Sequence, residues 1–199
     1  MTAEAFLEAA EALRYDVELL QQQFDASFEQ VCHRLTTLRR PGLEGIPMHF
    51  IRVDIAGNIS KRFSASGLRI PRYGSACPRW VMHEAFLTPG SLCSQISEMP
   101  DKSRYFSVAK VVAKPGLGHR APRSHYAVSI GCEINHAHRL TYADDLKLEE
   151  AQARAIPVGS ACRLCPRPDC PQRAAAPPTQ AEHSPTGGAL NISPGIGDG

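Results

Sequence analysis

Hydrophobic residues in the first 40 positions recur every three or four residues, which is the period of an amphipathic helix. The spacing is followed by Phe6, Leu7, Ala10, Leu13, Val17 and Leu20 in a first segment, and by Phe28, Val31, Leu35 and Leu38 in a second. Ser27 followed by Gln30 forms a capping-box start for the second segment, and Pro41-Gly42 ends it. The pattern predicts two helices, each with one apolar face.

From Met48 onward the pattern changes to short runs of β-branched and aromatic residues. Strands are predicted over residues 49–54, 59–64, 105–112 and 126–134, and a short helix over residues 79–87. Ala56-Gly57-Asn58 is typical of a hairpin turn between the first two strands. The fold class predicted is α+β, with an antiparallel sheet behind an N-terminal helical appendage. The last 26 residues, from Ala174, are rich in Ala, Pro, Gly, Thr and Ser and are expected to be disordered.

Composition and charge exclude several broad classes of protein. The 199 residues carry 22 Lys and Arg against 20 Asp and Glu, so no strong net field attracts the whole chain to nucleic acid or acidic lipid. The first 13 residues include Glu4, Glu8 and Glu11 and do not resemble a secretory signal, and no run of 18 apolar residues exists. We therefore expect a cytoplasmic protein without membrane contact, whose seven cysteines stay reduced.

Three of these cysteines, Cys162, Cys165 and Cys170, lie within nine positions and are separated by charged residues and prolines. Such a segment makes a poor apolar core, whereas thiolates suit zinc or iron-sulfur clusters. Both kinds of site usually need four protein ligands, so one ligand is missing. Cys77 is the preferred fourth ligand because its Ala-Cys-Pro setting repeats the Cys-Pro of Cys165 and Cys170, and Cys132 is the alternative. The spacing leaves zinc and a four-iron cluster equally open.

Other motifs give no sign of catalysis. His83-Glu84 begins like a zinc-peptidase helix, but Leu87 stands where that motif needs its second histidine. His136 and His138 fit a solvent-facing loop better than a metal site. Residues 19–38 have the look of a helix-turn-helix, so direct DNA binding is one alternative, although packing is the better reading because basic charge is scarce there. A second alternative function is that of a zinc-stabilised structural or protein-interaction module. No residue is assigned a catalytic role, and we expect that this chain is not an enzyme.

Basic residues next to aromatic ones suggest a binding site for a phosphate-bearing ligand. The basic residues are Lys61, Arg62, Arg69, Arg72, Arg79 and Arg104. Arg62 and Arg72 stand beside Phe63 and Tyr73, so cations for phosphates and rings for a base occur together. An ordinary solvated surface explains the same pattern equally well.

Several motifs in one order resemble the C-terminal half of short-chain fatty acyl transcriptional regulators. They are the run that begins at Phe28, Arg52-Val53-Asp54, the run Gly57 to Ser64, Cys77-Pro78 with Trp80 and His83, Gly131-Cys132-Glu133-Ile134, and the terminal cysteine motif with Asp169-Cys170-Pro171-Gln172-Arg173. The resemblance covers about Tyr15 to Ala174. Ordered motifs are far more specific than any single one.

The resemblance implies a domain plan and a ligand. Residues 1–40 correspond to the end of an ImmA/IrrE-like, peptidase-type domain, and residues 41–173 to the family's sensor domain. From this resemblance and the strand pattern, we expect the sensor to have a PAS- or GAF-like sheet, and residues 174–199 to be the disordered tail. The sensor is expected to bind a short-chain acyl-CoA and a four-iron, four-sulfur cluster, and to control propionate or acetate metabolism. Cys77 or Cys132 joins Cys162, Cys165 and Cys170 as cluster ligand.

The same resemblance, with the basic pattern, sets the expected ligand contacts and partners. The ligand residues predicted are Lys61, Arg62, Arg72 and Trp80. DNA is expected only through an N-terminal domain missing from this sequence or through a full-length partner. The prediction also allows this chain to assemble as a homodimer.

Overall fold

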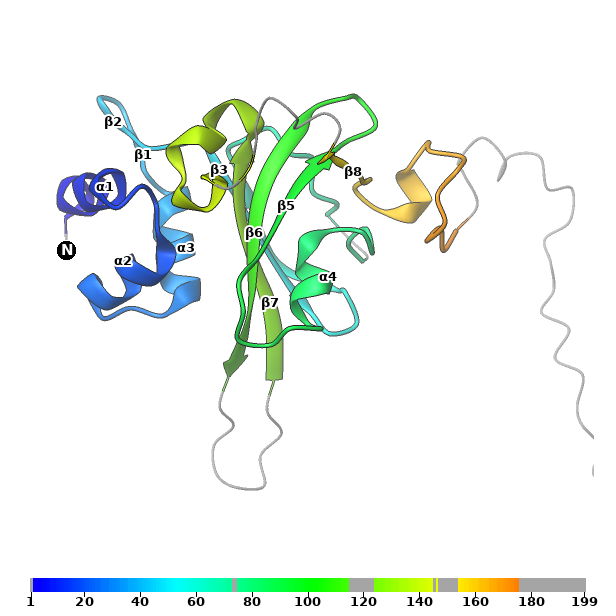
Figure 1. Cartoon of the computed structure of the whole chain (residues 1–199), viewed down its shortest axis with the longest axis horizontal. Coiled ribbons are helices and arrows are strands. Elements are labelled where there is room, and N and C mark those ends of the chain that lie inside the picture. Colours follow the sequence, from blue (N-terminus) through cyan, green and yellow to red (C-terminus); the bar gives the residue numbers. More distant parts are fainter. Residues whose placement is uncertain (1, 73–74, 115–123, 145, 147–153, 176–199) are drawn as a thin grey trace, which may run out of the picture.

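The computed structural model describes residues 2–72, 75–114, 124–144, 146 and 154–175. A central sheet separates three helices on one face from a short helix and the cysteine-rich segment on the other (Figure 1). The helices are α1 (Ala3–Ala12), α2 (Val17–Phe24) and α3 (Phe28–Thr36) on the first face and α4 (Val81–Ala85) on the second, with short 3-10 turns at η1 (Ile134–Arg139), η2 (Thr141–Ala143) and η4 (Cys162–Leu164). The predicted α+β class is confirmed.

Six strands form the sheet in the order β4-β3-β7-β6-β5-β8. They are β3 (Met48–Asp54), β4 (Ile59–Ser64), β5 (Cys93–Glu98), β6 (Arg104–Lys114), β7 (Ser124–Glu133) and β8 (Ile156–Pro157). All neighbours pair antiparallel except β5 and β8, which are parallel. The prediction of a purely antiparallel sheet is therefore wrong at this one edge, where the chain returns after η2 to reach the cysteines.

Successive side chains in a strand point to opposite faces, and this alternation divides the interior into two cores. Phe50 of β3 and Phe106 of β6 face α1, α2 and α3, and belong to one apolar cluster with Phe6 and Leu20. Ile51 of β3 belongs to a second cluster, which includes Trp80, Val81 and Met82 around α4. Residues 1–40 are consequently part of the main core, and their description as an appendage is corrected.

The N-terminal segment forms three helices where two were expected. Arg14 and Tyr15 have φ angles of 50° and 60°, which breaks the helical path between α1 and α2. Asp16 then starts α2, because its side chain accepts hydrogen bonds from the backbone N–H groups of Glu18 and Leu19. Apolar spacing continues across the break, so periodicity alone could not reveal it.

The second predicted helix ends earlier than expected. α3 stops at Thr36, and Pro41-Gly42 instead forms the turn between two short strands, β1 (Arg39–Arg40) and β2 (Leu43–Glu44). Gly42 has a φ of 79°, a left-handed conformation that glycine adopts without strain. The capping box of Ser27 and Gln30 is present as predicted.

α3 packs against the sheet and is not a free recognition helix. Glu29, on the face that would read DNA, is buried with an exposed fraction of 9 % and forms an ion pair with Arg52 of β3. In the described part of the chain, no helix is long and apolar enough to cross a membrane. Residues 176–199, which make up most of the expected tail, lie outside the described residues.

Candidate metal centre and anion groove

Four cysteines from two distant segments line one small cavity. Cys77 precedes α4, while Cys162, Cys165 and Cys170 come from the C-terminal segment, and all four border the same space. Cys77 and Cys165 are buried, and Cys162 and Cys170 are half-buried. The structure therefore brings the preferred fourth cysteine to the terminal trio, from more than 80 residues away in the sequence.

The cysteine-rich segment is attached to the end of β5. β8 pairs with β5 through Ser97 and Glu98, and the N–H of Val158 donates to the carbonyl oxygen of Glu98 at 2.9 Å. Arg167 reinforces this attachment, because its guanidinium donates to the carbonyl oxygens of Glu98 at 2.9 Å and of Val158 at 3.1 Å. These contacts hold the segment beside the start of α4, where Cys77 lies.

Gly159 lies between two of the sulfur atoms. Its N–H points to the Sγ of Cys77 at 3.5 Å, and a Cβ added to it would lie 2.7 Å from the Sγ of Cys165. A larger residue would therefore force Cys165 away from the cavity. Burial raises the pKa of the Cys77 thiol, an effect that the Gly159 N–H partly offsets, and a bound cation is what would favour the thiolate at such a position.

Cys132, the alternative fourth ligand, lies on the opposite face of the sheet. It is fully buried in the apolar cluster under α1, α2 and α3, as is Cys32. Burial raises the pKa of the Cys132 thiol to about 12 and also raises the pKa of Cys32. Both residues act as small apolar side chains in the core. Cys132 cannot reach the terminal cysteines without passing through the sheet.

The fit of a metal group can be judged from the donors and from the space between them. Four thiols with three Cys-Pro sequences, at Cys77, Cys165 and Cys170, match the donor set of zinc or four-iron sites. The cavity they border has a volume of only about 10 Å³, which is close to that of one water-sized sphere. Among the described residues, no group of three His, Cys, Asp or Glu side chains is arranged to hold a metal ion in this conformation.

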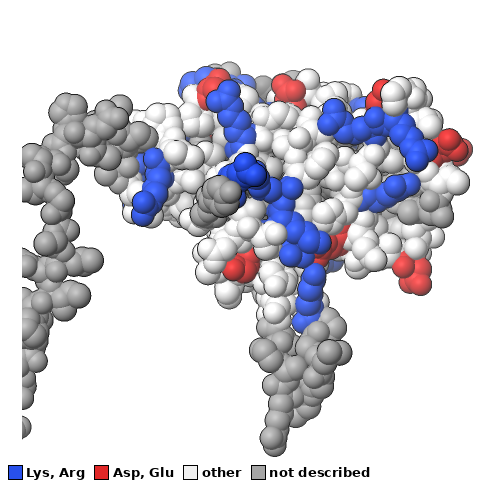
Figure 2. All heavy atoms as spheres, turned by 180° about the vertical axis from the view of Figure 1, so that it is seen from behind, with Lys and Arg blue, Asp and Glu red and all other residues white. Residues whose placement is uncertain are grey.

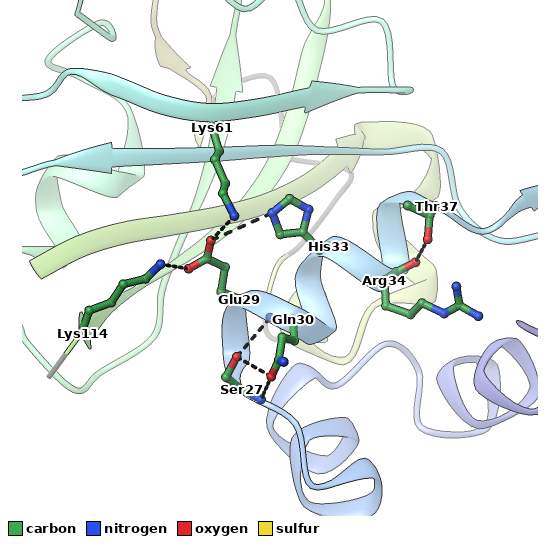
Figure 3. Close-up of a pocket in the computed structure, with 8 residues that line it drawn as sticks. All are labelled: Ser27, Glu29, Gln30, His33, Arg34, Thr37, Lys61 and Lys114. Atoms are coloured by element: carbon green, nitrogen blue, oxygen red, sulfur yellow. Dashed lines mark hydrogen bonds and ion pairs between the residues drawn. The ribbon is translucent and has the colours of Figure 1, made fainter. Parts of the chain in front are cut away.

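A second, larger hollow lies on the other face of the sheet, between α3 and the strands β4 and β6. This groove has a volume of about 730 Å³, and Figure 3 shows the eight side chains that line it. Glu29 lies at its base and accepts hydrogen bonds from Arg52 at 2.7 Å and from Lys61 at 3.0 Å. Lys114 approaches the second carboxylate oxygen of Glu29 at 3.4 Å.

The groove carries more positive than negative charge. Burial alone would raise the pKa of Glu29, but Lys61, Arg52 and Lys114 outweigh it and lower the pKa, so Glu29 is ionised at neutral pH. Three cations therefore surround one carboxylate. Burial lowers the pKa of His33, which leaves its ring neutral and able to accept or donate hydrogen bonds.

Arg34 adds a further cation to the groove. Its Nε is buried and has no hydrogen-bond partner among the described residues. Seen from the side opposite to Figure 1, Lys and Arg side chains form a band across the molecule (Figure 2). Lys and Arg side chains thus gather on the face seen in Figure 2, although the net charge of the whole chain is only +2.

The four predicted ligand residues do not line one pocket. Lys61 faces the groove, whereas Arg62, the next residue of β4, points to the other face and donates to the carbonyl oxygen of Ile70. Arg72 is exposed, and Trp80 is buried in the core around α4. Sequence reasoning missed His33, Arg34 and Lys114 as a set, although His33 and Arg34 lie within the second predicted helix. Nothing in the sequence joins them to Lys114.

These features define a class: an α+β domain with a thiol-lined site on one face of its sheet and a cationic groove on the other. Comparison with known proteins identifies the family. Residues 37–186 match the family described as short-chain fatty acyl coenzyme A regulator, C-terminal, and residues 1–36 match the IrrE N-terminal-like domain. The chain therefore belongs to the short-chain fatty acyl coenzyme A regulator family, and the resemblance seen in the sequence is confirmed.

Individual relatives agree with this assignment. The HTH-type transcriptional regulator PrpR of Mycobacterium tuberculosis is 47% identical over 169 residues, which are 85% of this chain and 35% of the relative. The propionyl-CoA carboxylase regulator of Cereibacter sphaeroides is 48% identical over 172 residues, which are 86% of this chain and 37% of the relative. This chain thus spans about a third of the length of these curated relatives. They are named as regulators and not as enzymes, as expected for this chain.

A solved structure shares the fold. It is described as a Mycobacterium tuberculosis transcriptional regulator, and it matches with a TM-score of 0.84 and 42% sequence identity over 98% of this chain and 57% of that chain. The arrangement of helices and sheet described above is therefore one that a related regulator also adopts.

Proposed function

We propose that this chain is the sensor part of a regulator of short-chain fatty acid metabolism, with an iron-sulfur cluster on one face of its sheet and a short-chain acyl-CoA on the other. The observation that carries the proposal is the meeting of Cys77 with Cys162, Cys165 and Cys170 around one cavity. The family and the names of the relatives support the regulatory role.

Cys77, Cys162, Cys165 and Cys170 are the proposed ligands of a four-iron, four-sulfur cluster. Such a cluster would supply a one-electron redox centre or a structural link between α4 and the C-terminal segment. The cavity is only about 10 Å³, so a bound cluster would require more space between the four thiols than they leave here.

Metal and sulfide analysis of the anaerobically purified chain tests this assignment. A four-iron cluster predicts about four irons and four sulfides per chain and a brown colour. About one zinc per chain, no sulfide and no colour would replace the cluster with the zinc-stabilised module, since zinc has a filled d shell. A chain with neither metal would remove the metal centre altogether.

The groove beside α3 is the proposed site of the acyl-CoA. Its volume of about 730 Å³ lies within the usual range of about 300–1,000 Å³ for small-molecule sites. Lys61, Lys114 and Arg34 offer cations for the phosphates of coenzyme A, and the unpartnered Nε of Arg34 is one donor that a phosphate oxygen could satisfy. Of the residues predicted from the sequence, Lys61 stays in this site, while Arg62, Arg72 and Trp80 lie elsewhere.

Calorimetry with propionyl-CoA and acetyl-CoA tests the groove. Lys61→Ala should weaken binding by about tenfold, because a charge-assisted hydrogen bond contributes about 1.5–3 kcal/mol. Arg62→Ala is a matched control, since it removes the neighbouring cation of the same strand from the opposite face. Equal loss in both variants would place the ligand elsewhere, and no heat with wild-type protein would remove the ligand assignment.

DNA binding is proposed for the intact regulator and not for this segment. The relatives are named as transcriptional regulators, and α3, the one candidate recognition helix, is packed on the sheet through Glu29. Retention of this chain on duplex DNA should therefore be weak. Strong retention that falls steeply with salt would instead support direct contact with phosphates.

A further inference from the structure

Arg173 is the one arginine whose side chain reaches from the C-terminal end of the segment back into the cysteine cavity. Its Nη1 donates to the carbonyl oxygens of Cys162 at 3.4 Å and of Ala175 at 2.7 Å. Its Nη2 donates to the carbonyl oxygen of Cys165 at 2.8 Å and to that of Arg167. The guanidinium thus ties together the backbones of two cysteines that border the cavity.

The third nitrogen of the same guanidinium is unused. Nε of Arg173 is buried and has no hydrogen-bond partner among the described residues, while the side chain borders the cavity together with all four cysteines. A buried donor without an acceptor is unfavourable, and a guanidinium stays charged at every pH of interest. A sulfur atom brought into the cavity would offer this N–H an acceptor.

Comparison with Arg167 shows that an Nε without a hydrogen-bond partner is not common to the arginines that border the cavity. Arg167 also borders the cavity, but its Nε and Nη2 donate to Val158 and Glu98, and the Glu98 carboxylate lies 3.9 Å away. That carboxylate also pairs with Lys102 and Arg104, but both of these Arg167 nitrogens have hydrogen-bond acceptors. Arg173 brings a cation and a free donor to the same place, and no described ion pair balances that charge.

We propose that Arg173 is a positioning residue for the cluster: its terminal nitrogens fix the backbone of Cys162 and Cys165, and its Nε donates a hydrogen bond to a sulfur of the bound cluster. This inference rests on the proposed function. A cluster with four thiolate ligands is anionic and gains negative charge when it takes up an electron, so a cationic N–H donor favours the reduced form. Arg173 accordingly raises the reduction potential and slows loss of the cluster.

The test compares three variants of the full chain, each reconstituted anaerobically. Arg173→Gln removes the charge and the Nε donor, Arg173→Lys keeps the charge but not the fork of donors, and Arg163→Gln removes an exposed cation of the same segment that does not border the cavity. Iron and sulfide content, the midpoint potential in a dithionite titration, and the lifetime of the cluster with a chelator are measured.

The expected result is a lower midpoint potential and a cluster lifetime about tenfold shorter in Arg173→Gln, the usual scale for losing a group that supports a metal ligand. Arg173→Lys should fall between this variant and wild type, and Arg163→Gln should match wild type. If Arg173→Gln takes up no cluster, a lowered potential in Arg173→Lys supports the inference and an unchanged one overturns it.

Failure of this inference can be told apart from failure of the proposed function. A loaded wild-type chain whose potential and lifetime are unchanged in Arg173→Gln overturns the role of Arg173 alone. A wild-type chain that takes up no iron-sulfur cluster overturns both.

Discussion

The two faces of the sheet use the same kinds of residue in different ways. On the face covered by α1, α2 and α3, Cys32 and Cys132 are fully buried among apolar side chains. On the face covered by α4, Cys77 lies at the edge of a smaller core and meets three further thiols. Residue type alone does not decide whether a cysteine packs among apolar side chains or lies beside other thiols. Its surroundings on one face or the other decide it.

Polar groups divide in the same way. The α4 face buries His49, Ser107 and Ser129 next to one another around a small space, whereas the helix face confines its buried charges to the Glu29 and Arg52 pair at the groove. Buried polar groups are tolerated where each has a partner, and both nitrogens of His49 have one. The helix face therefore provides most of the apolar stability, and the α4 face holds most of the chemically reactive groups.

The largest effect is expected from substituting one cysteine on each face of the sheet. With the proposed four-iron cluster in place, Cys77→Ser should reduce bound iron from about four per chain to less than about one, because such a cluster needs its four thiolates. Cys132→Ala should keep the iron and cost about 1 kcal/mol of unfolding free energy, since it removes only a small buried side chain. Iron analysis and urea unfolding measure the two results. Loss of iron in Cys132→Ala but not in Cys77→Ser would reverse the assignment of the faces.

The apolar role of the helix face is tested by a pair of aromatic residues directly opposite each other in β3 and β4. Phe50 is fully buried, whereas Phe63 is 37% exposed. Phe50→Ala should lower the unfolding free energy by about 3–5 kcal/mol through lost burial and the cavity left behind. Phe63→Ala should cost less than about 1 kcal/mol. Similar losses in urea unfolding would show that the edge of the sheet is as well packed as its centre.

The buried histidine of the α4 face predicts a pH dependence. Burial lowers the pKa of His49 to about 3, from an ordinary value near 6.5 in the unfolded chain. The unfolded state therefore binds the proton more readily, and stability is complete above pH 6.5 and falls as the pH decreases toward 3. Between pH 6.5 and 5 the loss due to His49 should be about 2 kcal/mol.

His49→Asn isolates this contribution, because an asparagine side chain does not titrate and can still hydrogen-bond to Ser66 and Ser107. Unfolding free energies at several pH values, measured for both proteins, give the difference in slope. The variant should have the flatter curve between pH 6.5 and 5. Parallel curves would mean that His49 accepts a proton in the folded state as easily as in the unfolded one.

The smallest effect concerns how helices begin on the two faces. α1, α2 and α3 start with side-chain caps at Thr2, Asp16 and Ser27, while α4 starts at Trp80 without one. Ser27→Ala should cost about 1 kcal/mol, because it removes the acceptor for the N–H of Gln30. Ser91→Ala, in the turn after α4, serves as an uncapped control and should have little effect in thermal unfolding.

Much of the local structure could be predicted from the sequence. The strands β3, β4, β6 and β7, the capping box of α3 and the presence of a helix after Trp80 all follow from interactions between residues close in the chain, which periodicity and capping rules describe. The terminal trio of cysteines, and the preference for Cys77 over Cys132, came from spacing and from the prolines that follow the cysteines. β5 was missed because most of its residues are polar, and β8 because it has only two residues.

Tertiary structure alone decided the rest. Cys77 and Cys132 are placed on opposite faces by strand register and by the path of the chain, and a shift of one residue would turn every side chain of β7 to the other face. The groove combines α3 with Lys61 and Lys114, which no local pattern connects. The amino-acid sequence determined which segments are helix or strand and supplied the thiols. Only packing of the sheet between its two layers determined which thiols and cations meet, because those distances depend on contacts between residues far apart in the chain.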